Sequence, residues 1–139
     1  MSKLPYYIYR VTRVFYLLRI FPIAYALMLL NRIIFGLYLP GEARLGRGVR
    51  FGYGGSGVVI HKDAVIGDNV VIGPGVVIGG KSGIAQVPVI GHGCFLAAGS
   101  KILGPVMLGN NVTVGVNSVV LQSFDDGAVV AGIPARELN

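Results

Sequence analysis

The sequence has 139 residues, of which 53% are hydrophobic and 13% are charged, and its formal net charge is +6. This length suits one domain with a short appendage, and the 22 glycines follow no Gly-X-Y period, which excludes a collagen-like chain. The only cysteine, Cys94, excludes an intramolecular disulfide framework, so we expect a reducing compartment, the cytoplasm.

The positive charge is concentrated at the amino terminus. Residues 1–50 hold eight Lys and Arg against one Glu, a balance of +7, whereas residues 51–139 hold four against five acidic residues, a balance of −1. The basic residues lie among Phe, Leu, Ile and Tyr, so anionic lipid headgroups match them better than nucleic acid does. We therefore expect no nucleic-acid partner.

Residues 1–40 predict two apolar helices, at about 6–21 and about 22–38, because proline is tolerated in a first helical turn and disfavoured further in. Neither offers the roughly 20 mainly apolar residues of a spanning helix. We interpret the pair as an interfacial segment on the inner face of a membrane. The alternative is a helical pair that packs against the repeat or against another subunit. The delimiting prolines are Pro5, Pro22 and Pro40, and the first helix is interrupted by Arg10, Arg13 and Arg19.

From residue 60 to residue 120, every sixth residue is a branched aliphatic. A helix has period 3.6 and a strand period 2, whereas period six is typical of hexapeptide parallel β-helix repeats. Residues 41–139 therefore predict an all-β, three-sided prism of about five coils, roughly 24 Å tall at the strand spacing of a parallel sheet. The series is Ile60, Ile66, Ile72, Ile78, Ile84, Ile90, Leu96, Ile102, Leu108, Val114 and Val120.

Two glycine-rich stretches interrupt the repeat. Phe51 to Gly57 has four glycines in seven residues, which indicates close approach to a ligand or to the next coil. Gly79 to Pro88 predicts a loop that leaves the prism, although Ile84 keeps the six-residue register. Cys94 occupies an inward position and predicts a packed thiol. We expect the helices and the Asp125-Asp126-Gly127 turn to cover the open ends.

The runs 51–80, 87–120 and 131–136 together resemble the serine acetyltransferase branch of left-handed β-helix acyltransferases. They most resemble the short forms associated with bacterial surface-polysaccharide synthesis. The resemblance implies a homotrimer with active sites between prisms, acetyl-CoA as donor, a hydroxyl as acceptor and a histidine general base. It also implies a coenzyme groove along the coil edges that ends near the Ala-Gly-Ile-Pro-Ala-Arg run at 131–136.

The sequence differs in three ways from what the resemblance to serine acetyltransferases leads us to expect. Tyr53 stands where they carry a catalytic loop histidine, Val87 stands where a histidine precedes the proline, and their long helical amino-terminal domain is lacking. Tyr53-Gly54-Gly55 followed by Val-Ile-His61 resembles the short forms instead. The predicted acceptor is therefore a sugar hydroxyl on a nucleotide- or lipid-linked polysaccharide precursor, with serine as the alternative. A non-catalytic scaffold subunit is the alternative of another class.

The general base of such a reaction takes the hydroxyl proton as the thioester is attacked. Only His61 and His92 are available, so both are candidate catalytic residues. They are 31 residues apart and one coil is 18, so they occupy different corners of one prism. We expect them to meet only across a subunit interface.

The remaining candidates concern binding. The backbone turn at Gly79 and Gly80 is suited to binding an anion, as are the neighbouring Lys81 and Ser82. We assign these four residues to the coenzyme phosphates. The glycine-rich loop of Tyr53, Gly54 and Gly55 is the acceptor-binding candidate. We expect no metal, because two histidines make no defensible zinc set. Further coenzyme-binding candidates along the groove of the resemblance are Ala98, Lys101, Pro134 and Arg136.

Overall fold

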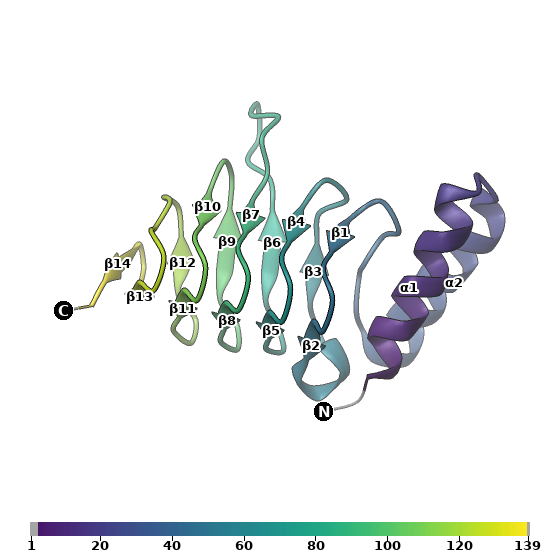
Figure 1. Ribbon diagram of the computed structural model, residues 1–139, viewed down its shortest axis with the longest axis horizontal. Helices are drawn as coiled ribbons and strands as arrows, with labels where there is room; N and C mark the ends of the chain where they lie inside the picture. The colour runs from purple at the N-terminus through teal and green to yellow at the C-terminus, as the bar shows by residue number, and fades with distance from the viewer. Residues whose placement is uncertain (1–2, 139) are drawn as a thin grey trace.

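The computed structural model describes residues 3–138, with two helices at one end of a prism of short strands (Figure 1). The helices are α1 (Leu4–Leu17) and α2 (Phe21–Phe35). A short 3₁₀ turn, η1 (Gly52–Gly55), lies between β2 and β3. The strands are β1 (Arg44–Leu45), β2 (Arg50–Phe51), β3 (Val59–Ile60), β4 (Val65–Ile66), β5 (Val71–Ile72), β6 (Val77–Gly79), β7 (Val89–Ile90), β8 (Phe95–Leu96), β9 (Lys101–Leu103), β10 (Met107–Leu108), β11 (Thr113–Val114), β12 (Val119–Val120), β13 (Val129–Gly132) and β14 (Ala135–Glu137).

The strands form three sheets, one for each side of the prism. One sheet has the order β1-β4-β7-β10, the second β14-β13-β11-β8-β5-β2 and the third β12-β9-β6-β3. We call these the first, second and third sides, in the order in which the chain visits them. All pairings are parallel except that of β13 with β14. The predicted parallel β-helix is confirmed.

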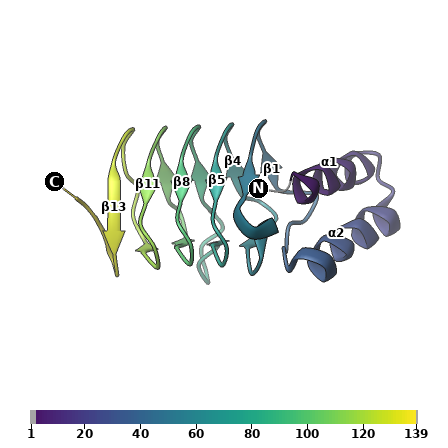
Figure 2. The same ribbon diagram turned by 90° about the horizontal axis from the view of Figure 1, so that it is seen from below.

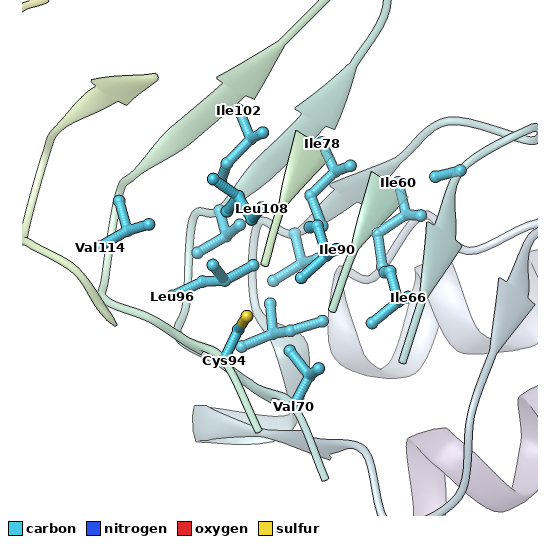
Figure 3. Packing of buried hydrophobic residues seen from close by; sticks show 14 of the residues in the cluster. Ile60, Ile66, Val70, Ile78, Ile90, Cys94, Leu96, Ile102, Leu108 and Val114 are labelled. Atoms are coloured by element: carbon cyan, nitrogen blue, oxygen red, sulfur yellow. The ribbon is translucent and has the colours of Figure 1, made fainter. Parts of the chain in front are cut away.

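The interior of the prism is filled by the aliphatic series (Figure 3). All members of the series except Ile84 are at most 3% exposed. Cys94 is buried among them, as predicted, and its thiol donates to the carbonyl of Gly109 at 3.1 Å. Burial raises the pKa of the Cys94 thiol, which suits packing rather than nucleophilic attack.

The prediction for Ile84 is wrong. Val77 pairs with Lys101, 24 residues on, whereas Lys101 pairs with Val119, 18 residues on. The predicted loop after β6 therefore inserts six residues, one full repeat unit, which leaves the six-residue period of the sequence undisturbed. Ile84 lies in this loop and is 38% exposed.

The two helices are shorter than predicted, because the chain reverses between them. Arg19 adopts a left-handed φ of 59° after α1, and Pro22 then lies in the first turn of α2, where proline is tolerated. α2 ends at Gly36, whose φ of 71° is typical of a glycine after a helix.

The helical pair covers the amino-terminal end of the prism, as expected (Figures 1 and 2). The buried Tyr9 hydroxyl donates to the carbonyl of Ala43 and accepts the N–H of Leu45 at 3.1 Å. Arg13 donates to the carbonyl of Gly41 at 2.9 Å. After α2 the chain enters the core through buried Leu37 and Leu39, so one core includes residues on both sides of position 40.

The other end of the prism differs from the prediction. The side chain of Asp126 accepts the N–H of Asn110 at 2.7 Å, so the Asp125-Asp126-Gly127 turn belongs to a regular corner. The tail turns back after β13, and β14 pairs with its edge. This antiparallel pairing satisfies backbone groups that an open strand would expose.

The outer face of the helical pair remains apolar and exposed. None of the helices in the described range is long and apolar enough to cross a membrane. Several of these side chains recur at spacings of three and four residues, as on one helical face. On α1 and just after it they are Leu4, Tyr7, Val11, Val14 and Leu18, and on α2 they are Ile23, Leu30 and Ile33.

Candidate active site

His61 lies at the corner between the third and first sides, directly after β3. Its backbone N–H donates to the carbonyl of Ile78 at 2.8 Å, which fixes it beside the next coil. Its Nδ1 accepts the N–H of Asp63 at 3.0 Å and lies 3.9 Å from a carboxylate oxygen of Asp63. In this conformation the neutral imidazole carries its proton on Nε2.

The glycines assigned to the coenzyme lie beside this histidine. The pairing of β3 with β6 places Gly79 next to His61 on the adjacent coil. A methyl group on Gly80 would lie 3.6 Å from Cδ2 and 3.7 Å from Nε2 of His61. The structure therefore brings His61 together with Gly79 and Gly80, as one chemical site would require.

Lys81 and Ser82 lie in the six-residue insertion, which rises above the prism between β6 and β7 (Figure 1). The N–H of Ile84 donates to the carbonyl of Lys81 at 3.0 Å and closes a tight turn. Gly83 has a φ of 80° in that turn, a conformation that glycine adopts without steric cost. Both Lys81 and Ser82 are exposed.

Tyr53, Gly54 and Gly55 lie at another corner, between the second and third sides. Tyr53 is 86% exposed and has a left-handed φ of 50°. A methyl group on Gly54 would lie 2.9 Å from the Phe35 ring, and one on Gly55 would lie 3.3 Å from the Leu37 side chain. The close approach expected for this loop is therefore to the segment around the end of α2.

The remaining coenzyme candidates share that second corner or lie beyond it. Lys101 donates its ammonium to the carbonyl of Gly99 at 2.6 Å. The backbone N–H of Asn117 donates to the carbonyl of Ala98 at 3.0 Å, so Ala98 helps to stack the corner. Pro134 and Arg136 are exposed, in the turn after β13 and in β14.

His92 belongs to the third corner, in a ladder of side chains that joins successive coils. Its Nδ1 accepts the N–H of Asp68 at 2.8 Å, and its own N–H donates to Oδ1 of Asn110 at 2.9 Å. Asp68 and Asp126 accept N–H groups in the same way, from Arg47 and Asn110. His92 therefore makes the same hydrogen bond as the Asp and Asn side chains at equivalent positions.

The two histidines thus lie at different corners, as the spacing predicted. The site candidates are likewise divided: His61 and the Gly79–Ser82 group share one corner, and Tyr53, Ala98 and Lys101 share another. Within one chain these groups do not form a single pocket. Among residues 3–138, no group of three or more His, Cys, Asp or Glu side chains could hold a metal ion.

Three neighbouring cavities are bordered by Glu42, which lies in the segment that joins the helical pair to the prism. One of about 300 Å³ contains His61 and Gly79, one of about 590 Å³ contains charged residues, and one of about 320 Å³ is mainly apolar. The sequence analysis missed these groups, because they come from α1, β1 and a corner that are distant in sequence. The charged lining residues are Arg13, Glu42, Arg44, Lys62 and Asp63.

Comparison with known proteins agrees with this architecture. Residues 55–86 and 88–122 match the bacterial transferase hexapeptide family (six repeats). The serine acetyltransferase of Staphylococcus epidermidis is 40% identical over 109 residues, which are 77% of this chain and 51% of that protein. The chain spans about half the length of the curated relatives it matches.

Solved structures extend the similarity to the helices. Soybean serine acetyltransferase complexed with serine has a TM-score of 0.91 at 34% identity, covering 97% of this chain and 56% of that one. A serine acetyltransferase in complex with CoA has a TM-score of 0.90 at 30% identity, covering 96% and 55%. The uncovered part of this chain is shorter than α1 or α2, so the pair belongs to the matched region. The two helices therefore have counterparts in these relatives, while the chain covers little more than half of each relative.

A left-handed prism of hexapeptide coils, with a histidine beside a glycine-rich edge, defines the class. The chain belongs to the hexapeptide-repeat transferases, and the relatives described above are serine acetyltransferases.

Proposed function

We propose that this protein is an O-acetyltransferase that moves the acetyl group of acetyl-CoA to a hydroxyl. The observation that carries this proposal is the position of His61 beside the glycine edge at Gly79 and Gly80, in a fold shared with a serine acetyltransferase bound to CoA. Backbone N–H groups in such an edge suit a developing oxyanion, and the exposed Lys81 suits a coenzyme phosphate.

His61 is the general base in this proposal. For this role Nδ1 must give up the N–H of Asp63 that it now accepts, take the ring proton from Nε2 and donate it to the Asp63 carboxylate, at present 3.9 Å away, which leaves Nε2 free. Nε2 then takes the acceptor's hydroxyl proton as the oxygen attacks the thioester carbonyl. The tetrahedral intermediate expels the CoA thiolate, which receives that proton back from Nε2.

Two acceptors are to be compared. The names of the relatives favour serine over the sugar acceptor. The second candidate, a sugar hydroxyl, is favoured by Tyr53 and Val87 at the positions where the resemblance leads us to expect histidines, and by the charged cavity beside His61.

We expect the full-length protein to release CoA thiol from acetyl-CoA only when a hydroxyl acceptor is present. Thiol release with free serine, with nucleotide sugars and with no acceptor decides between the acceptors. Calorimetry with acetyl-CoA tests the scaffold alternative, because a non-catalytic subunit need not bind it. Absence of binding at millimolar acetyl-CoA would refute the enzymatic proposal.

We further propose that a homotrimer completes the site. One chain presents its candidate groups at separate corners, and exposed apolar side chains such as Phe95 and Met107 lie on the prism sides. A neighbouring prism that packs on these sides can place its Tyr53 corner against the His61 corner. A solution mass of a single chain at assay concentration would contradict this assembly.

We place the protein on the inner face of a membrane, through the helical pair. Arg10, Arg19 and Arg32 are exposed beside the apolar outer face, and residues 3–41 contain no acidic side chain. The chain should float with vesicles that contain phosphatidylserine, and the double variant Arg10→Gln/Arg19→Gln should lose about fivefold in affinity for each arginine. Arg136→Glu, at the far end of the prism, is the control. Equal flotation of both variants would exclude this surface.

A further inference from the structure

The three cavities around Glu42 share lining residues, and the charged cavity adjoins each of the other two. The cavity with His61 and the charged cavity are both bordered by Glu42 and Lys62. The charged and the apolar cavity are both bordered by Glu42 and Tyr16. A single extended ligand can therefore lie along all three, from the histidine to the helical pair.

The middle cavity suits a phosphate attached to a polar group. Arg44 and Lys62 are exposed, and neither side chain makes a hydrogen bond or an ion pair with another residue in the described range. Arg13 contributes a third cation from α1. The carboxylates of Glu42 and Asp63 can accept hydrogen bonds from hydroxyls, whereas the cations can donate to phosphate oxygens. At about 590 Å³ this cavity has the size of sites for ligands much larger than free serine.

The third cavity suits an apolar chain. Its walls include the rings of Tyr16 and Phe21, whose centroids are 5.8 Å apart, together with Tyr25 and Met28. Phe21 and Tyr25 are more than half exposed, so apolar area is available for burial. This cavity lies on the helical pair, whose outer face is itself apolar.

We propose that these cavities bind a phosphate ester that carries an apolar chain, with the phosphate among Arg13, Arg44 and Lys62 and the chain between Tyr16 and Met28. A hydroxyl-bearing group on the far side of the phosphate would then lie beside His61. This last point rests on the proposed acetyl transfer, whereas the binding site does not. A lipid-linked sugar phosphate and a bilayer phospholipid both contain a phosphate ester and an apolar chain.

Calorimetry without acetyl-CoA tests the site, with geranyl phosphate, geraniol and inorganic phosphate as probes. We expect geranyl phosphate to bind at least about tenfold more tightly than either fragment. Arg44→Gln/Lys62→Gln should weaken geranyl phosphate about tenfold and leave geraniol unchanged. Arg47→Gln/Arg50→Gln removes the same charge outside the three cavities and should have no effect.

A second pair of variants tests the apolar end. Phe21→Gln should weaken geranyl phosphate roughly tenfold, whereas Ile33→Gln, on the same helix but outside the cavities, should not. Dihexanoyl phosphatidic acid tests a bilayer lipid: if it binds more tightly than geranyl phosphate, a phospholipid is the ligand and the acceptor assignment is overturned. Equal affinity for geranyl phosphate and its fragments, or no loss in either cavity variant, would overturn the site. Because acetyl-CoA is absent, these outcomes leave the proposed acetyl transfer to be judged by thiol release.

Discussion

His61→Asn is expected to lower kcat for acetyl transfer by about 10²–10⁴-fold, the usual contribution of a positioned general base. The KM for acetyl-CoA should change little, because the Asn oxygen can replace Nδ1 as acceptor of the Asp63 N–H and so keep the corner, whereas Asn has no Nε2 to take the acceptor's proton. Thiol release at saturating acceptor, with the acceptor identified as above, measures the effect. A kcat within threefold of the wild type would remove His61 from the mechanism.

His92→Asn is the matched control for that variant. Asn110, one coil away, already accepts the N–H of His92 through Oδ1 at 2.9 Å, so Asn at position 92 can preserve the ladder. We expect near-wild-type kcat and stability. A loss in His92→Asn as large as that in His61→Asn would instead favour a site that both histidines share across a subunit contact.

The second large effect concerns stability. Ile78 and Ile84 occupy the same place in the six-residue period, but Ile78 is 0% exposed and Ile84 is 38% exposed. Ile78→Ala removes buried methyl groups from the narrow interior, so we expect a loss of about 2–5 kcal/mol in the free energy of unfolding. Ile84→Ala should change it by about 0.5 kcal/mol or less.

Urea unfolding at one fixed chain concentration checks this pair, because assembly makes apparent stability depend on concentration. Circular dichroism at 218 nm can follow the strands. Equal losses in the two variants would mean that Ile84 is packed, and the six-residue insertion would then be misplaced.

Much of the architecture follows from local sequence. The aliphatic series predicts the prism because each coil buries its aliphatic side chains only when the residues recur every six positions. The helices, the loop after β6 and the inward Cys94 follow from equally local signals. Because the insertion has the length of one full repeat unit, it preserves the six-residue period. The period therefore does not reveal that Ile84 lies outside the core.

The candidate site shows where local signals end. His61 and His92 are both histidines at corners, and the sequence treats them alike. Only the tertiary structure places His61 beside Gly79 and Gly80 and gives His92 the hydrogen bond of a corner ladder. The cavities around Glu42 likewise depend on the docking of α1 onto β1, which brings Arg13 to Lys62. The sequence by itself determined the repeat, because the aliphatic residue of each six-residue unit is buried inside the coil that this unit helps to form. The tertiary structure decided the site, because the residues of the site meet only when distant segments pack together.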